Sequence, residues 1–153
     1  MLWDKMNASA GDVSNAEDYK SLTVDAKRDA LLLVNDFVDS FLEAHDCPMK
    51  TQMQIDLCVE EVFVNIASYA YGDKTGTAQI ELSGKNGEVT LVFSDEGQAY
   101  DPLAKADPDT TLDAESRQIG GLGVFLVKKT MDAVSYRREN GKNILSMRKT
   151  WNV

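Results

Sequence analysis

Two polar residues, Glu61 and Asn65, stand four positions apart in a segment whose apolar residues have helical spacing. Residues four apart in a helix lie one turn apart on the same face, and Cys58 and Ser68 extend that face. A carboxylate and a carboxamide in this arrangement could hold a cation or orient a water molecule. The pair alone favours the simpler interpretation, an exposed polar surface that has no chemical role.

A carboxylate also ends a segment of alternating apolar residues. Val89, Leu91 and Phe93 share strand parity with Asp95, so Asp95 is expected to face the same apolar layer. A buried carboxylate needs hydrogen-bond donors, because burying it unpaired is costly. Gly97, two residues later, would let another group approach the backbone. Asp95 is therefore a candidate binding residue, and the alternative is an aspartate that caps a turn.

The stretch IGGLGVFLVKKTMD (119–132) places glycines at 120, 121 and 123 ahead of a helical apolar pattern, with the helix expected from Val124. Free N–H groups and the positive end of a helix dipole favour phosphate binding at such a place. The Walker pattern is absent, and so is the last glycine of the dinucleotide fingerprint. A phosphate cradle and a flexible hinge therefore both remain open.

Asn143 is the last candidate. It shares strand parity with Leu145 and Trp151, which would turn its side chain inward beside Asp95. The alternative is a turn asparagine that follows Gly141.

The elements that must position these residues follow from apolar periodicity. We expect a strand at 19–25, helices at 26–46 and 49–72, strands at 77–84 and 88–97, a helix to 132, and a C-terminal hairpin around ENGK. The polar segment 98–119 is too long for a simple connection and is typical of a lid. This order predicts an α+β fold, a two-layer α/β sandwich with a mostly antiparallel sheet and helices on one face.

Composition limits the classes of function. The chain has 153 residues, which suits one domain at 19–153 after a flexible polar tail at 1–18. Its net charge of −9 argues against nucleic acid as a direct partner. No apolar run approaches the roughly 20 residues that span a bilayer, so we expect a cytoplasmic protein without membrane contact. Two cysteines without a CxxC pattern and a single histidine make a zinc site improbable.

Taken in order, three segments resemble the N box and the two glycine boxes of the GHKL, or histidine kinase-like, ATPase superfamily. They are EVFVN (61–65), DEG (95–97) and GGLGVFLVKK (120–129). This superfamily includes histidine kinases, gyrase B and Hsp90. Within it the chain looks closest to the anti-sigma-factor serine/threonine kinases of bacterial partner-switching systems. The likeness extends from Tyr19 to Lys149, and the ordered set of motifs is far more specific than any one of them.

The resemblance implies a role for each candidate residue. Glu61 would be the general base, and Asn65 would hold Mg²⁺ between the phosphates of ATP. Asp95 would accept a hydrogen bond from the adenine amino group. The remaining ATP-binding residues would be Gly97 beneath the base, Gly120 as the lid hinge, Gly121, Leu122, Gly123 and Val124 around the phosphates, and Asn143 near adenine.

Three features depart from the superfamily pattern. Ala99 stands where the first glycine box often has its second glycine, and related anti-sigma kinases also vary there. Tyr69 replaces a basic or imidazole residue that often follows the N-box asparagine by four. The dimerisation and phosphoacceptor elements of sensor histidine kinases are missing, so that function is not supported.

The implied function is an ATP- and Mg²⁺-dependent serine/threonine protein kinase that regulates transcription in a bacterium. It would phosphorylate an anti-anti-sigma (STAS-type) partner and sequester a sigma factor or another regulator, with a homodimer as one possible assembly. The alternative is a non-catalytic module of the same fold, in which ATP only gates partner binding. A third reading, an α/β domain that binds no nucleotide, is also carried forward.

Overall fold

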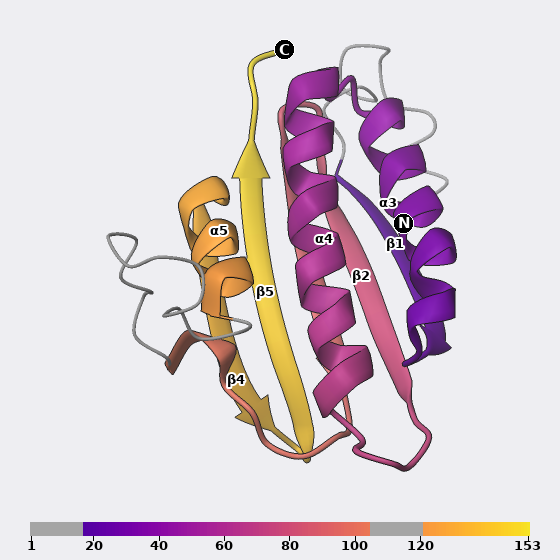
Figure 1. The fold of residues 1–153 in the computed structure, drawn as a ribbon. Coiled ribbons are helices and arrows are strands. Elements are labelled where there is room, and N and C mark those ends of the chain that lie inside the picture. Colours follow the sequence, from indigo (N-terminus) through magenta and orange to yellow (C-terminus); the bar gives the residue numbers. More distant parts are fainter. Residues whose placement is uncertain (1–16, 105–120) are drawn as a thin grey trace.

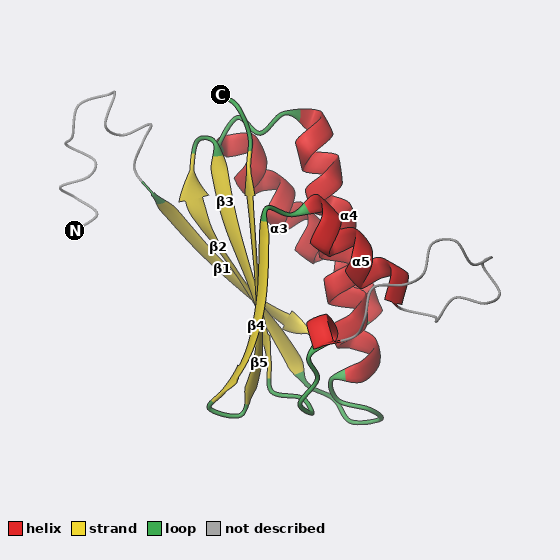
Figure 2. Cartoon of the chain, turned by 90° about the vertical axis from the view of Figure 1, so that its left-hand side faces the viewer, coloured by secondary structure: helices red, strands yellow, loops and turns green. Residues whose placement is uncertain are grey.

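The computed structural model describes residues 17–104 and 121–153, and these form one antiparallel sheet with helices on one face (Figures 1 and 2). The strands are β1 (Asp18–Asp25), β2 (Thr77–Lys85), β3 (Glu88–Asp95), β4 (Ala133–Glu139) and β5 (Lys142–Thr150). The helices are α3 (Leu31–Ala44), α4 (Met49–Tyr69) and α5 (Gly121–Thr130), with short 3-10 turns η1 (Arg28–Ala30) and η2 (Pro102–Ala104). The predicted two-layer sandwich is confirmed.

The described strands follow the order β1-β2-β3-β5-β4, and each neighbouring pair is antiparallel. β3 is therefore central, and its register with β5 sets Asp95 opposite Asn143. The β4–β5 turn matches the expected hairpin, because Asn140 and Gly141 both have positive φ, at 53° and 77°. Such turns suit the right-handed twist of paired strands.

The core lies between the sheet and the helices, with α4 across its middle (Figure 1). Ile55, Val59 and Phe63 face the sheet and are fully buried. Their spacing leaves the two flanks of α4 free to face α3 on one side and α5 on the other, because side chains repeat every 3.6 residues around a helix. Both flanks carry polar residues, and the hydrogen-bond and ion-pair partners of these residues differ between the two flanks.

Several predicted helix boundaries were wrong. The helices expected at 26–46 and 49–72 are Leu31–Ala44 and Met49–Tyr69. The helix expected from Val124 begins at Gly121, so the last two glycines of the motif lie in the first turn of α5. Glycine lowers helix propensity, so the pattern pointed to a later start. The side chain of Leu122, together with Gly120 and the predicted lid from residue 105 onward, lies outside the described residues.

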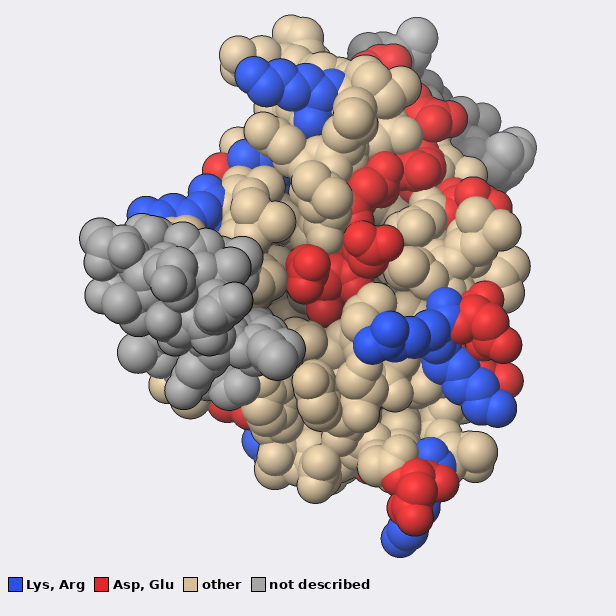
Figure 3. All heavy atoms as spheres, viewed as in Figure 1, with Lys and Arg blue, Asp and Glu red and all other residues tan. Residues whose placement is uncertain are grey.

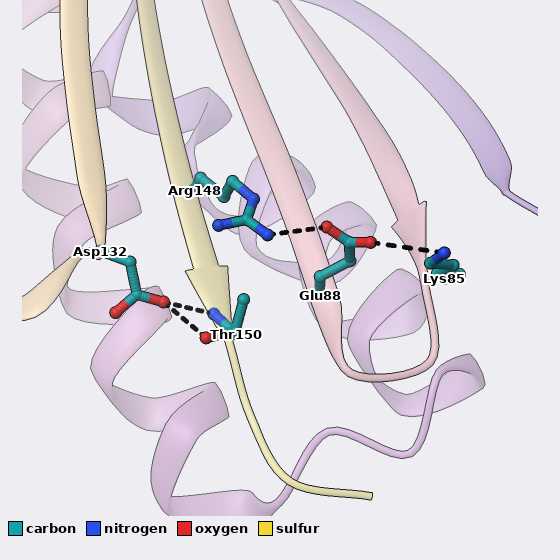
Figure 4. A network of polar contacts seen from close by, with 5 residues as sticks. All are labelled: Lys85, Glu88, Asp132, Arg148 and Thr150. Atoms are coloured by element: carbon teal, nitrogen blue, oxygen red, sulfur yellow. Dashed lines mark hydrogen bonds and ion pairs between the residues drawn. The ribbon is translucent and has the colours of Figure 1, made fainter.

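Polar contacts fasten the end of the sheet (Figure 4). Arg148 and Lys85 both pair with Glu88, with N–O distances of 3.2 and 3.9 Å. Asp132 accepts hydrogen bonds from the backbone N–H and the hydroxyl of Thr150 at 2.7 and 2.8 Å. These bonds, the hydroxyl's first, lower the pKa of Asp132. The contacts are exposed, so each contributes little to stability. The Glu88 pairs link β3 to β2 and β5, and the Asp132 bonds tie the α5–β4 junction to the end of β5.

Within the described ranges, none of the helices is long and apolar enough to cross a membrane.

Candidate nucleotide-binding site

A pocket opens between α4, α5 and the adjoining ends of β3, β4 and β5. It encloses about 640 Å³ including its open mouth, which suits a small-molecule site. Its polar lining side chains are Glu61, Asn65, Asp95, Gln98 and Asn143. Phe93, Val127 and Leu145 are among the apolar residues that line the same space. The structure thus brings together five of the residues singled out from the sequence, Val124 and four of these polar ones, although they lie up to 82 positions apart (143 − 61).

Asp95 is 6% exposed and lies at the end of β3. Its Oδ1 atom accepts two hydrogen bonds of 2.9 Å, from the backbone N–H of Gly97 and from the side-chain amide of Asn143. These donors offset the cost of burying the carboxylate. No donor among the described residues reaches Oδ2, so one carboxylate oxygen remains available at the pocket.

Asn143 connects Asp95 to the loop that follows β3. Its Nδ2 also donates to the carbonyl of Gln98 at 2.8 Å, and its Oδ1 accepts from the backbone N–H of Tyr100 at 3.2 Å. The same Oδ1 accepts from the Tyr136 hydroxyl at 2.5 Å. With both ends of its amide engaged, Asn143 has a fixed orientation. It holds Asp95 in place and fastens the first residues of the predicted lid.

Sequence reasoning missed Tyr136 and Gln98. Tyr136 comes from β4, and its parity with Val134 could have pointed it toward the helices, but the strand order that places β4 beside β5 is a long-range property. Gln98 donates from its side chain to the Tyr69 carbonyl at 2.8 Å. It therefore links the loop to the end of α4, which no local pattern indicates.

Gly97 allows the loop to lie against the end of α4. A Cβ atom at this position would overlap the carbonyl group of Ala70. The close approach is fixed by the backbone N–H of Gln98, which donates to the Ala70 carbonyl at 2.7 Å. Arg138 secures the same turn by donating to the Gly97 carbonyl at 2.8 Å. The glycine is thus required for packing, independently of the base that the resemblance sets above it.

Gly123 plays the corresponding part on α5. A Cβ atom there would overlap Oε2 of Glu61 and approach its Cδ to 2.8 Å. The Glu61 carboxylate therefore sits directly against the first turn of α5, in space that only glycine leaves open. The N–H groups of a first helical turn have no partner within the helix and carry the positive end of its dipole. Glu61 and these amides consequently face the same end of the pocket as Asn65.

The residues present fit ATP and Mg²⁺. A free carboxylate oxygen at an apolar wall suits an aromatic ring that bears an amino group, and the first turn of α5 suits phosphate. Among the described residues, no cluster of three or more His, Cys, Asp or Glu side chains could hold a metal. Mg²⁺ bound through Asn65 would therefore take its other ligands from phosphate and water, which is its usual preference.

Comparison with known proteins agrees with this geometry. A family model for the histidine kinase-like ATPase domain matches residues 24–149. The chain belongs to the histidine kinase-like ATPase family. The superfamily resemblance inferred from the three motifs is thereby confirmed.

Relatives of this ATPase domain include named protein kinases. The serine/threonine-protein kinase BtrW of Bordetella bronchiseptica is 32% identical over 99 residues, which cover 64% of this chain and 70% of the relative. The serine-protein kinase RsbW of Staphylococcus aureus (strain bovine RF122 / ET3-1) is 25% identical over 140 residues, covering 86% and 87%. The kinase name is thus shared by relatives that differ in organism and in extent of match.

A solved structure shows the same fold. The RsbU and RsbW domains of Rv1364c from Mycobacterium tuberculosis superpose with a TM-score of 0.59 at 14% sequence identity. The match covers 87% of this chain and 32% of that longer chain. At this identity the likeness supports the architecture alone.

Proposed function

We propose that this ATPase domain is a Mg²⁺-dependent serine/threonine protein kinase of the anti-sigma-factor type. The observation that carries the proposal is the arrangement of two carboxylates in one pocket. Asp95 offers one unpartnered oxygen at the apolar end, and Glu61 lies against the first turn of α5 at the other. One group suits recognition of a base and the other suits proton transfer.

Adenine recognition would depend on Asp95 and its supports. Oδ2 would accept from the exocyclic amine of adenine, while Gly97 and Asn143 hold Oδ1. Apolar side chains such as Phe93 and Val127 would cover the ring and exclude water. A carboxylate fixed in advance by two donors loses little freedom on binding, which favours affinity.

Phosphoryl transfer would occur at the α5 end of the pocket. The amides of the first turn, around Gly121 and Gly123, would bind phosphate oxygens, and Asn65 would hold the cation. Mg²⁺, when bound, supplies neutralisation of phosphate charge. Glu61 would accept the proton of a serine or threonine hydroxyl presented by the partner, which makes that oxygen a better nucleophile.

The protein partners are inferred from the family resemblance, and the kinase names of the relatives support a protein substrate. The phosphoacceptor would be an anti-anti-sigma (STAS-type) domain, and a sigma factor or similar regulator would be bound in alternation with it. Such a kinase would act on transcription from the cytoplasm of a bacterium. A homodimer is a possible assembly.

Transfer of radiolabelled phosphate from ATP to a purified STAS-type domain tests the kinase function. We expect Glu61→Gln to lose transfer by two orders of magnitude or more while ATP binding persists, because a general base typically contributes about 10²–10⁴-fold. Glu81→Gln is the matched control, since Glu81 lies on β2 and bonds Tyr19 instead of lining the pocket. Equal loss in both variants would contradict the role of Glu61.

The alternative is a module that binds ATP without transferring phosphate. It would give normal Mg-ATP binding by calorimetry, no labelled partner, and unchanged regulation in the Glu61→Gln variant. In that case ATP would act by changing partner affinity through the conformation that it favours.

A further inference from the structure

The outer, solvent-facing side of α4 carries a row of exposed apolar side chains. Met49, Met53 and Leu57 are 64%, 59% and 54% exposed and repeat every four residues. This spacing aligns them along one side of the helix, over about 12 Å at 1.5 Å per residue. Single exposed apolar residues are ordinary, but an aligned set indicates a contact surface. We refer to these three residues as the apolar stripe.

Acidic side chains border the apolar stripe. Asp56 and Glu60 lie within one turn of it on α4, and Asp39 and Glu43 lie on the facing side of α3. None of the four forms an ion pair with another described residue. Figure 3 shows acidic side chains gathered in a band over α3 and α4, with uncharged surface beside it. We refer to these four residues as the acidic band.

Two members of the acidic band, Asp39 and Asp56, are in contact. The Asp56 carboxyl contacts that of Asp39 across the helix pair, and Glu43 adds a further negative charge. Each aspartate has an Oδ1 atom that is buried without a hydrogen-bond partner. Gln52 donates to Glu43 at 3.1 Å, but this reaches neither aspartate. The raised pKa of Asp56 keeps a proton on this pair near neutral pH, so the pair itself needs no cation. Glu43 and Glu60 have no ion pair among the described residues and would attract cationic groups from outside.

The chain's own nearby cations lie at the ends of this surface. Lys50 is in the first turn of α4, and Arg28 precedes α3 and donates to Ser68. Because Arg28 contacts Ser68 near the end of α4 and Lys50 lies in its first turn, these two cations are at opposite ends of the helix. The surface between these ends therefore has negative charge and apolar side chains but no described cation.

We propose that the apolar stripe and the acidic band bind an amphipathic, lysine- or arginine-rich helix of a protein partner. The stripe would pack against the apolar face of that helix, which would present residues at i, i+3, i+4 and i+7 spacing. The acidic band would pair with its basic residues and favour association with them over acidic competitors. Nucleic acid is disfavoured by the charge, and a metal is disfavoured because no described carboxylate cluster can hold one.

This surface is separate from the nucleotide pocket. Glu60 and Glu61 are neighbours in sequence, yet Glu61 lines the pocket while Glu60 does not. A helix has room for a different contact on each flank, so occupation of one side need not obstruct the other. The inference therefore does not rest on the proposed kinase function, and it can be tested without nucleotide.

Fluorescence anisotropy with a labelled synthetic peptide is the direct experiment. The peptide has leucines at helical i, i+3, i+4, i+7 spacing and lysines on the opposite face, and a scrambled peptide of equal composition is the reference. We expect the amphipathic peptide to bind saturably, and Leu57→Glu to weaken it about tenfold or more, equivalent to about 1.4 kcal/mol. The matched control is Leu33→Glu, because Leu33 is 61% exposed and lies on the other side of α3.

A second pair of variants tests the charges. Asp39→Asn with Glu60→Gln should weaken binding, whereas Asp25→Asn with Asp73→Asn removes the same charge elsewhere and should have little effect. Equal loss in both pairs, or equal binding of the scrambled peptide, would mean general attraction to an acidic protein and would overturn the proposal. Absence of saturable binding would overturn it as well.

Alkylation of Cys47 tests independently where the peptide binds. Cys47 lies between α3 and α4, is partly exposed and is close enough to Asp56 for that charge to raise its pKa, after the larger effect of burial. Cys58 is fully buried, so alkylation of the folded protein reports on Cys47. Bound peptide should slow this alkylation severalfold. An unchanged rate at saturating peptide would place the peptide elsewhere and contradict the proposal.

Discussion

The two flanks of α4 both carry acidic residues, but the surroundings of these residues differ. Toward α5, Glu61 and Asn65 face a pocket whose polar groups are already oriented. These groups include the hydrogen-bonded Asp95 and the N-terminus of α5. Toward α3, Asp56 contacts Asp39 in a pair that its raised pKa keeps protonated near neutral pH, and Glu60 has no ion pair among the described residues. The first flank has the features of a site prepared for an anion. The second is an acidic surface whose glutamates have no ion pair among the described residues.

The difference shows that burial and charge alone do not define a binding site. Asp95 is more deeply buried than either aspartate of the acidic band, yet two donors compensate it and leave one oxygen free. A pocket carboxylate such as Asp95 is distinguished by the hydrogen-bond donors that hold it, here the Gly97 N–H and the Asn143 amide. The following variants test this comparison, in decreasing order of expected effect.

Asp95→Asn should have the largest effect. The amide would turn a donor toward either the adenine amine or the Asn143 amide, so one contact must be lost. We expect Mg-ATP affinity to fall about 100-fold, or roughly 3 kcal/mol, measured by calorimetry. Asp132→Asn is the control, since Asp132 bonds Thr150 outside the pocket. Unchanged affinity in Asp95→Asn would favour the reading in which the domain binds no nucleotide.

Gly123→Ala should come next. Alanine is the better helix former by about 1 kcal/mol, so thermal stability should not collapse. Its Cβ would nevertheless displace the Glu61 carboxylate, and we expect phosphoryl transfer to drop by at least about tenfold, because catalysis depends on position. In a Glu61→Gln background the same change should cost little more, since the displaced group is already inactive. Additive losses would argue against this account.

Tyr136→Phe should have a smaller effect. It removes the hydroxyl that donates to Asn143 Oδ1 and leaves the ring in place. We expect a loss of about 1 kcal/mol in the free energy of unfolding by urea, with a few-fold loss of ATP affinity. Loss of stability with no change in affinity would restrict the Asn143 network to a structural role.

Asp56→Asn should have the smallest effect and the opposite sign. Burial first, then contact with Asp39, raises the pKa of Asp56 to about 8. The folded protein then holds more protons than the unfolded chain between about pH 4 and pH 8, so its stability falls as pH rises through that window. We expect the variant to gain about 1 kcal/mol near pH 8 and less near pH 5, a limited amount because the group is partly exposed.

Urea unfolding of Asp56→Asn and the unmodified protein at the two pH values measures this gain. The matched change Asp73→Asn, at an exposed position, should show no such pH dependence. A gain for Asp56→Asn that is equal at both pH values would contradict the account of crowded carboxylates.

Local pattern in the sequence was sufficient for much of this protein. Alternation in 88–95 set Asp95 on the apolar side of its strand, and the spacing of Glu61 and Asn65 set both on one helix face. These inferences hold because side-chain direction within a strand or helix depends only on nearby residues. The order of three motifs then indicated the ATPase superfamily, which no single motif could do.

Only the tertiary structure decided which groups meet. Gly123 of α5 leaves room for Glu61, Tyr136 fixes the orientation of Asn143, and Asp56 contacts Asp39 on another helix. Each of these is a contact between segments that are distant in the sequence. Sequence spacing carries no information on such contacts, because they depend on strand order and helix packing. The sequence by itself therefore determined the elements and the candidate residues. The fold decided which carboxylates have donors and which do not.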